Sequence, residues 1–271
     1  DLKLSIQSFR GVEKENKKCY YGDIAHHENN KKGFTLAEVL ITLGIIGVVA
    51  AMTLPALITN YKNKELATRA KKSYSIISQA VQKYQADNGV VGDITGLFDP
   101  SKTSAEVAEN FAKYFDGAYL CKNQSSGDCS KFHYPLIYAS PLYDENGVSR
   151  ASWVNYPIIV LKDASLISIT QNSVCEYKTS GYQYDSDGNT IVDSSGNPVI
   201  FEWTEYMCAT ITFDTNGMSK PNQYGADAFQ VKVRSDGTFS GWSGAGWNSL
   251  KNILQGGNPI YTKYTAGESK D

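Results

Sequence analysis

The chain has 271 residues and a formal net charge of -2, and this length suits one or two domains. Residues 1–33 hold seven basic and five acidic residues, so the rest of the chain is slightly acidic. Nucleic acid is therefore an unfavoured main partner, because its phosphate backbone rewards basic surfaces. No phosphate-binding loop, dinucleotide fingerprint, H-E-x-x-H or G-x-S-x-G motif occurs, and a single histidine, His133, follows residue 33. The sequence favours a non-enzymatic function.

Residues 1–30 are polar and charged and show no helical or strand periodicity. The adjacent histidines His26 and His27 would point in different directions on any regular element, so we expect a solvent-exposed linker there and no metal site. Lys31 and Lys32 follow directly and precede an apolar stretch. This arrangement favours a cytoplasmic amino end by the positive-inside rule.

The apolar stretch occupies the 25 positions from residue 34 to residue 58, and its only charge is Glu38. About 20 apolar residues are enough to cross a bilayer as an α-helix, so we expect a membrane-spanning segment here. A carboxylate at the centre of such a helix costs roughly 2.5–3.5 kcal/mol, and less near an end. The position of Glu38, one turn inside the stretch, indicates that its carboxylate has a cationic partner.

The residues K-K-G-F-T-L-A-E-V-L-I-T-L, in a match over about residues 31–60, resemble the amino-terminal signature of type IV pilins and of the pseudopilins of type II secretion. The resemblance implies that a prepilin peptidase cuts after Gly33 and methylates the new amino terminus at Phe34. It also implies that Glu38 pairs with the amino terminus of a neighbouring subunit, and that Pro55 is the helix-weakening proline of the family. An ordinary signal anchor, with Glu38 reaching the membrane interface, is the alternative.

These features divide the chain into four parts. Residues 1–33 are a leader that is removed on processing and is long for the family. Residues 34–58 are the transmembrane or filament-core half of a long helix, and residues 59–89 are its amphipathic half. Residues 90–271 form a globular head with a carboxy-terminal tail.

The amphipathic half has apolar residues at steps of three, four and seven, which predict one buried stripe. The stripe consists of Leu66, Ala70, Ile77, Val81 and Tyr84. The sequence Asp87-Asn88-Gly89 is a helix stop, so the helix is about 80 Å long at 1.5 Å per residue. We expect its second half to pack against the head.

A second helix is predicted from a T-x-x-E capping box at Thr103 and Glu106 to a stop near Asp116-Gly117. From residue 132 the chain becomes rich in β-branched and aromatic residues, with turn signals such as Asp187-Gly188 between the runs and Asp236-Gly237 within the last one. These runs are residues 132–139, 153–163, 165–178, 197–217 and 228–242. We expect antiparallel hairpins, an exposed excursion over residues 185–197 and a partly ordered, glycine-rich tail from residue 241.

The predicted fold class is therefore α+β and pilin-like. A long amino-terminal helix, membrane-spanning in its first half, packs on an antiparallel β-sheet head that carries a second short helix.

Four cysteines follow the leader, which itself contains Cys19, and an even number beyond a membrane segment indicates disulfides in an oxidising compartment. Of the three possible pairings we favour Cys121–Cys129, which closes a short polar loop, and Cys175–Cys208, which ties two strands. A zinc site of four thiolates is the alternative, but the spacings C-x7-C and C-x32-C lack the tight C-x2-C knuckles of zinc ribbons.

The loop from residue 213 to residue 229 resembles a recurrent segment, D-x-N-G-x-x-x-P-N-x-x-G-x-D-x-F, of some pilin-like proteins. Asp214, Asn216 and Asp227 would gather oxygen ligands for calcium, which some pseudopilins bind in a carboxy-terminal loop. The alternative is a turn in which Asp214 and Asn216 make local hydrogen bonds, Gly217 takes a positive φ and Asp227 caps the returning chain. The loop lacks the dense carboxylates of an EF hand.

The resemblance implies a structural subunit of a type IV pilus or a type II secretion pseudopilus. Its partners would be other pilin or pseudopilin subunits, the prepilin peptidase and an inner-membrane assembly platform. It would start as a single-pass inner-membrane protein, with its head in the periplasm or outside, and end in a periplasmic or cell-surface filament. The alternative is a minor or tip subunit whose aromatic-rich head binds a surface, a ligand or secreted cargo. Its candidate contact residues are Trp153, Trp203, Trp242 and Trp247.

Overall fold

The computed structural model describes residues 33–142, 151–185, 190–265 and 267. The chain divides into two compact units, Asp1–Met52 and Thr53–Asp271. The predicted leader, residues 1–33, lies outside the described residues except for Gly33, and so does part of the predicted excursion over residues 185–197.

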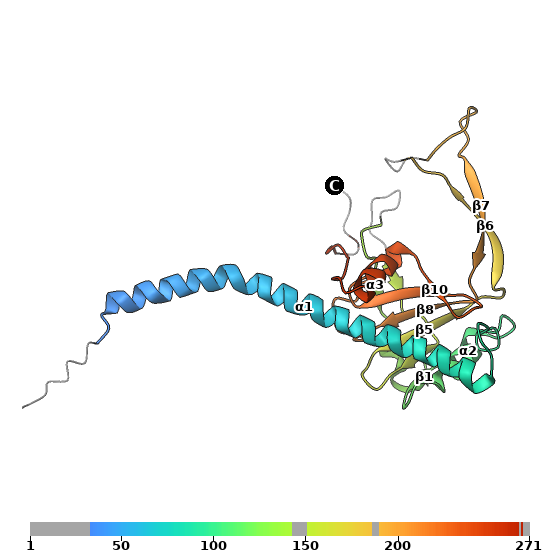
Figure 1. Cartoon of the computed structure of the whole chain (residues 1–271), viewed down its shortest axis with the longest axis horizontal. Helices are drawn as coiled ribbons and strands as arrows, with labels where there is room; N and C mark the ends of the chain where they lie inside the picture. Colours follow the sequence, from blue (N-terminus) through green and yellow to red (C-terminus); the bar gives the residue numbers. More distant parts are fainter. Residues whose placement is uncertain (1–32, 143–150, 186–189, 266, 268–271) are drawn as a thin grey trace, which may run out of the picture. The chain divides into compact units, whose positions relative to one another are not determined.

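The longest element is α1 (Leu36–Asn88), which confirms the predicted long helix (Figure 1). In the first unit its apolar side chains are exposed, for example Leu43 at 60% and Ile46 at 62%. Among the described residues, α1 is the single helix that is long and apolar enough to cross a membrane. Its apolar first half is therefore available to lipid or to another protein.

In the second unit α1 packs on the head along the predicted stripe. The predicted residues Leu66, Ala70, Ile77 and Val81 are buried, and Ser73 and Ala80 join them. Tyr84, also predicted, is partly buried against the same core. The ammonium of Lys72 lies 2.6 Å from the Asp163 carboxylate and ties the exposed side of this stripe to the head.

The second helix, α2 (Ser104–Ala112), begins with the predicted capping box: the Glu106 carboxylate accepts a hydrogen bond from Thr103 N, and Thr103 Oγ1 accepts one from Glu106 N. It ends at Ala112, so the predicted end near Asp116-Gly117 is wrong. After Ala112 the backbone tightens into i→i+3 hydrogen bonds, such as Phe115 N to Ala112 O at 3.1 Å. This tighter turn brings Phe115 into the core.

The head contains an antiparallel six-stranded sheet in the order β1-β4-β5-β8-β9-β10. Its strands are β1 (Tyr119–Cys121), β4 (Ile158–Val160), β5 (Leu166–Gln171), β8 (Ala209–Asp214), β9 (Ala228–Val233) and β10 (Phe239–Ser240). Two smaller antiparallel pairs are β2 (Pro135–Ile137) with β3 (Ala151–Trp153), and β6 (Glu176–Tyr182) with β7 (Ile200–Tyr206). Short helices are η1 (Gly127–Phe132), η2 (Ser243–Ala245) and α3 (Trp247–Leu254).

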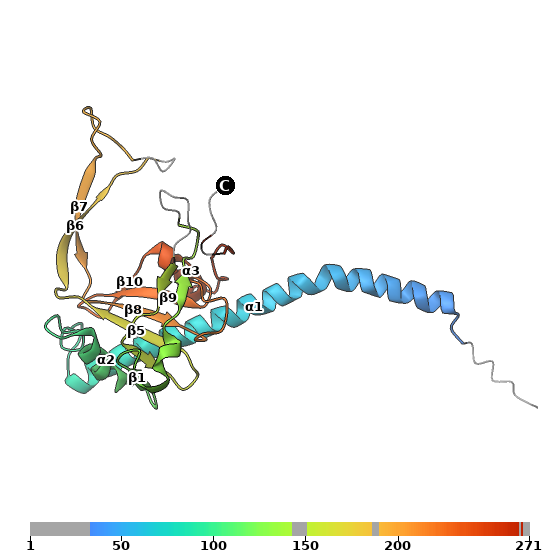
Figure 2. The ribbon, with the colours of Figure 1, turned by 180° about the vertical axis from the view of Figure 1, so that it is seen from behind.

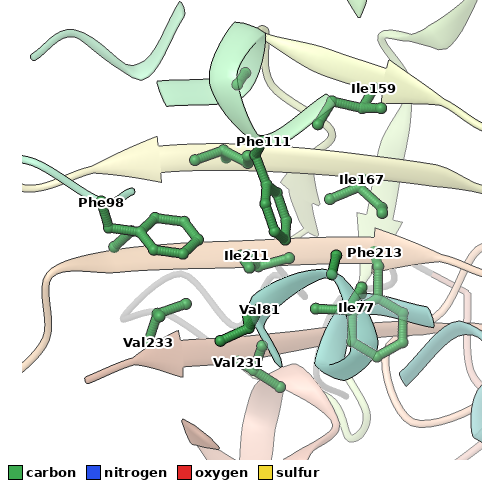
Figure 3. Packing of buried hydrophobic residues seen from close by; sticks show 14 of the residues in the cluster. Ile77, Val81, Phe98, Phe111, Ile159, Ile167, Ile211, Phe213, Val231 and Val233 are labelled. Carbon is green, nitrogen blue, oxygen red and sulfur yellow. The ribbon is translucent and has the colours of Figure 1, made fainter. Parts of the chain in front are cut away.

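The core follows from the two-residue alternation of the strands. Ile159 of β4 packs in the cluster that contains the stripe of α1, whereas its neighbours Ile158 and Val160 pack in a second cluster with the η1 region. Figure 3 shows Ile77 and Val81 of α1 beside the strand residues of the first cluster. β4 is thus buried on both faces, whereas β8 and β9 alternate between buried apolar residues and half-buried polar ones such as Thr212 and Gln230.

The predicted run over residues 228–242 forms β9 and β10 around the Asp236-Gly237 turn, and two further predicted β runs each divide into two strands. The run over residues 165–178 becomes β5 and β6, and the run over residues 197–217 becomes β7 and β8. The break lies at the cysteines, because Cys208 N donates to Val233 O of β9 while Met207 N donates to Cys175 O. β6 and β7 leave the sheet at this point and run away from it as a separate two-stranded ribbon (Figures 1 and 2).

The tail is more ordered than its glycine content suggests. α3 lies within it, and Leu250 and Ile253 of this helix are buried in the first core cluster. Trp247, Leu250 and Ile253 recur at three-residue steps, which is the helical signal that the surrounding glycines obscured.

Candidate assembly site at the start of the long helix

Glu38 occupies the third position of α1 and forms a capping box with Thr35. Glu38 Oε2 accepts hydrogen bonds from Thr35 N at 2.8 Å and from Thr35 Oγ1 at 2.9 Å. In return, Glu38 N donates to Thr35 Oγ1 at 3.2 Å. A carboxylate is also favoured here by the partial positive charge of the helix amino end. Thr35 is a contributor that the sequence analysis missed, although its T-x-x-E spacing is the same signal as at Thr103.

The second carboxylate oxygen of Glu38 is available to another molecule. Within the described part of the chain, Oε1 accepts no hydrogen bond, whereas Oε2 accepts two. Phe34, Glu38, Val39 and Thr42 line a hollow on the helix surface. A cationic group that entered this hollow would meet Glu38 without disturbing the cap of its own helix.

The predicted cut site lies in extended chain before α1. Gly33 has no neighbouring atom within 4 Å of the position that a Cβ would take, and the Phe34 side chain is 86% exposed. A protease would reach this peptide bond without unfolding any element. Pro55 lies inside α1, where it removes one backbone donor, and Thr59 Oγ1 donates to Pro55 O at 2.9 Å.

The start of the chain thus combines an accessible Gly-Phe junction, a long apolar helix and a carboxylate one turn inside it. Residues 29–54 match the family described as "Prokaryotic N-terminal methylation motif". Type II secretion system core protein G of Aeromonas hydrophila is 27% identical over 93 residues, which cover 34% of this chain and 64% of that protein. The chain spans just under two thirds of this relative's length. These two matches support the type IV pilin and pseudopilin class for the start of the chain.

A second family match covers the rest of the helix and most of the head. Residues 56–238, more than half of the chain, match "Family of unknown function (DUF6613)". The chain therefore belongs to this family. No solved structure matches the chain.

The four cysteines of the head form two disulfides, Cys121–Cys129 and Cys175–Cys208. This is the pairing that the sequence favoured, and it leaves no thiolates for the alternative zinc site. Cys121–Cys129 closes the loop before η1, and Cys175–Cys208 joins the two chain segments that leave the sheet as β6 and β7. The second bond therefore closes the base of the ribbon.

In the predicted calcium loop, Asp214 ends β8 and is 1% exposed. Its Oδ1 accepts a hydrogen bond from Asn216 N at 3.0 Å, and its Oδ2 accepts one from the Tyr134 hydroxyl at 2.9 Å. Gly217 has a φ of 62°, which an L side chain would strain. These are the features of the predicted turn.

Asp227 is fully buried beside this turn. Its Oδ1 accepts a hydrogen bond from Gln223 N at 2.8 Å and its Oδ2 one from Asn222 N at 3.0 Å, so it caps the returning chain. Thr215 N donates to Asp227 O at 2.9 Å and holds the two acidic segments together. The fold therefore brings Asp214 and Asp227 to one buried site.

Burial of two carboxyl groups at one site disfavours their ionised forms. Burial, and then the nearby charge of Asp227, hold the pKa of Asp214 well above its usual range. Burial likewise raises the pKa of Asp227. Asn216 Oδ1 is buried without a hydrogen-bond partner. In the described residues no three His, Cys, Asp or Glu side chains cluster, so a cation here would depend on Asn216 and backbone oxygens beside the two carboxylates.

The other residues considered for binding do not meet in one place. His133 stacks on Trp153 with ring centroids 4.8 Å apart, and its Nδ1 lies 2.8 Å from Val154 O. Trp203 stacks on Phe201 in the ribbon. Trp153, Trp203 and Trp242 are exposed at 48%, 39% and 44%, whereas Trp247 packs against the core. The predicted tryptophan surface is therefore distributed over separate elements.

Proposed function

We propose that the protein is cut after Gly33, methylated on the amino group of Phe34 and assembled into a helical filament. The observation that carries the proposal is Glu38, whose Oε2 caps its own helix while Oε1 stays available. An intramembrane carboxylate is costly unless it is paired. The new amino terminus at Phe34 of a neighbouring subunit would supply the missing cation and fix the axial register.

The exposed apolar half of α1 supplies the driving force for this assembly. Burying apolar surface contributes about 25 cal/mol per Å², so side chains such as Leu43 and Ile46 stabilise a bundle of neighbouring helices. Head-to-tail contacts that do not close generate an open helix of subunits. Before assembly the same surface would anchor the subunit in the inner membrane, with the head on the far side from Lys31 and Lys32.

The test is mass spectrometry of the amino-terminal peptide from the sheared extracellular fraction and from the membranes of the native cell. A peptide that begins at methylated Phe34 in sheared material identifies a surface pilus subunit. The same peptide confined to membranes identifies a short secretion pseudopilus subunit. An uncut amino terminus in both fractions would leave an ordinary signal anchor and overturn the proposal.

The exposed aromatic residues favour one second role, a minor or tip subunit that binds a ligand with its head. Phe201 and Trp203 stack with centroids 4.8 Å apart on the ribbon, and both are exposed. Large exposed aromatic side chains are enriched at binding surfaces. Immunogold labelling separates the roles, because a filament subunit labels along the whole filament and a tip subunit labels its end.

The site at Asp214 and Asp227 fits a bound calcium ion, which we propose as a structural cofactor of the head. Two carboxylates and the unpartnered Asn216 Oδ1 are the hard oxygen donors that calcium prefers. A bound divalent cation would also favour the ionised forms that burial opposes. Adding the chelator EGTA to metal-loaded protein should lower the melting temperature of the head, and the variant Asn216→Ala should lose the effect. An unchanged melting temperature would leave the turn alone as the function of this loop.

A further inference from the structure

Beyond the contacts at its base, the ribbon formed by β6 and β7 has no layer of described residues packed on either face. Its strands pair with each other over seven residues each, and its side chains are largely exposed. An isolated two-stranded ribbon is marginally stable in water. Here the Cys175–Cys208 disulfide and the ion pair of Glu205 with Lys232 (3.2 Å) hold its base to the sheet. The outer part of the ribbon remains free to meet a partner.

The ribbon and the second half of α1 have opposite charge. Residues 175–208 contain six acidic residues and one basic residue, Lys178. Residues 62–83 of α1, which we call the stem, contain six basic residues and one acidic residue, Glu65. The acidic character of the head is thus concentrated in the ribbon, and complementary charge steers and orients association between proteins.

One face of the ribbon presents unpaired carboxylates. Glu176 and Glu202 are exposed, and neither forms an ion pair with any described residue. Glu202 lies opposite Ser180, four residues beyond Glu176 on the same strand, so both carboxylates are on the same face. They are about 13 Å apart along the ribbon at 3.3 Å per residue.

The stem presents a matching pair of ammonium groups. Lys64 and Lys71 are exposed, and neither forms an ion pair within the part of the chain that the structure describes. Residues seven positions apart lie on one face of a helix, about 10 Å apart along its axis. This face points away from the buried stripe of Leu66 and Ala70. The lysine and glutamate spacings agree within the reach of these long side chains.

We propose that the ribbon of one copy docks on the stem of an adjacent copy, with Glu176 and Glu202 facing Lys64 and Lys71. The inference rests on the proposed filament, which supplies adjacent copies of this chain. Tyr182 and Tyr206 lie on the same ribbon face as the two glutamates and are 51% and 43% exposed. The Tyr206 ring already has the Arg234 guanidinium 5.3 Å from its centroid, so the Tyr182 ring is the one that would add a cation–π contact to a stem lysine.

Charge reversal tests this docking in the native cell with the full chain. The ribbon variant Glu176→Lys/Glu202→Lys and the stem variant Lys64→Glu/Lys71→Glu should each lose filaments, because like charges then face one another. The chain that combines all four substitutions restores opposite charges and should recover filaments. Recovery in the combined chain excludes misfolding as the cause of the losses, and normal filaments in both double variants would overturn the docking.

Lys178 provides a control of opposite sign. It lies on the same ribbon face between Glu176 and Glu202, where it repels the stem lysines. The variant Lys178→Glu should therefore strengthen docking, although it adds the same kind of surface change as the other variants. A lower yield of assembled protein from Lys178→Glu would contradict the charge argument.

Cross-linking tests the contact directly. Ser180→Cys, between the ribbon glutamates, and Thr68→Cys, between the stem lysines, are expressed as two separate chains in one cell and oxidised. We expect a disulfide-linked pair of copies, and no such pair when Ser125→Cys in the loop before η1 replaces Ser180→Cys.

Filaments with no ribbon–stem cross-link would refute the docking and leave the proposed function intact. The stem could instead bind anionic lipid headgroups. In that case the Ser180→Cys chain and the Lys64→Glu/Lys71→Glu chain would bind phosphatidylglycerol vesicles with unequal affinity, and no cross-link would form. This result would also refute the docking. A chain that is never cut after Gly33 would refute the proposed function instead.

Discussion

The isoleucines of α1 show how one helix is used in two ways. Ile46, in the first unit, is 62% exposed, whereas Ile77, in the second, is 1% exposed. Apolar residues surround the helix before residue 58 but form a single stripe after it. An apolar surface on all sides needs lipid or other subunits around it, whereas one stripe needs a single partner, here the head. The same type of side chain therefore contributes to folding in the second half and, under the proposed function, to assembly in the first.

The largest expected effect separates assembly from folding at Glu38. Glu38→Ala removes the carboxylate half of the capping box together with the charge, and we expect it to abolish filaments while the head remains folded. Glu38→Gln keeps a capping-box side chain but removes the charge, so it should fail as Glu38→Ala does. Filament yield in the sheared fraction is the measurement. Full assembly by Glu38→Gln would show that capping of α1, and no charge pairing, is the role of this residue.

The comparison of the two halves can be tested with the same substitution at two sites. Ile77→Ala should lower the free energy of unfolding of the head by about 2–5 kcal/mol, because it leaves a cavity among buried residues. Ile46→Ala should change it by less than about 0.5 kcal/mol. Denaturant unfolding in detergent, followed by a probe of the head, measures both. Equal losses at the two sites would show that the first half of α1 also packs within its own chain.

The sequence was informative where local periodicity decides the structure. The stripe of Leu66 and Ile77 follows from 3.6-residue spacing alone, and the resemblance of residues 31–43 supplied the expected roles of Gly33 and Glu38. The capping box at Thr103 was predicted for the same reason. Thr35 was missed although its T-x-x-E motif is identical, because it lies inside the apolar stretch that was assigned as a transmembrane segment.

The features that the sequence did not predict are those that depend on tertiary contacts. The β run over residues 197–217 has no break in its composition, but a disulfide and the pairing of Cys208 with β9 divide it into ribbon and sheet. α3 lies in a glycine-rich tail and is specified by burial of Leu250 in the core. The sequence pattern predicted Asp214 and Asp227 as ligands of one site. Their burial, and hence their raised pKa values, depends on the strands around them and was not predicted.

A pH-dependent effect is expected in the head and not in the apolar half. Because burial raises the pKa of Asp214, its protonated form is favoured in the folded state. The stabilising contribution is complete below the unfolded pKa of about 4 and is lost as the pH rises through the folded pKa, by at most about 1.4 kcal/mol per pH unit. Asp214→Asn, measured in EGTA, should therefore gain stability relative to the native chain as the pH rises from about 4 through the folded pKa of Asp214. A difference that stays constant with pH would place the titration elsewhere.

The smallest expected effect uses the two capping boxes, which have the same sequence spacing but lie in different units. Thr103→Ala removes the cap of α2, whose residues Val107 and Phe111 are buried in the head, and should cost about 1 kcal/mol of its free energy of unfolding. Thr35→Ala removes the cap of α1, where the neighbouring Phe34 is exposed, and should leave the head unchanged. It should instead remove one of the two hydrogen bonds to Glu38 Oε2, the one from Thr35 Oγ1, and keep the one from the backbone N–H of residue 35. If Thr35→Ala lowers filament yield while Glu38 is intact, the cap positions the carboxylate for its partner; if yield is unchanged, charge at Glu38 suffices wherever the side chain points.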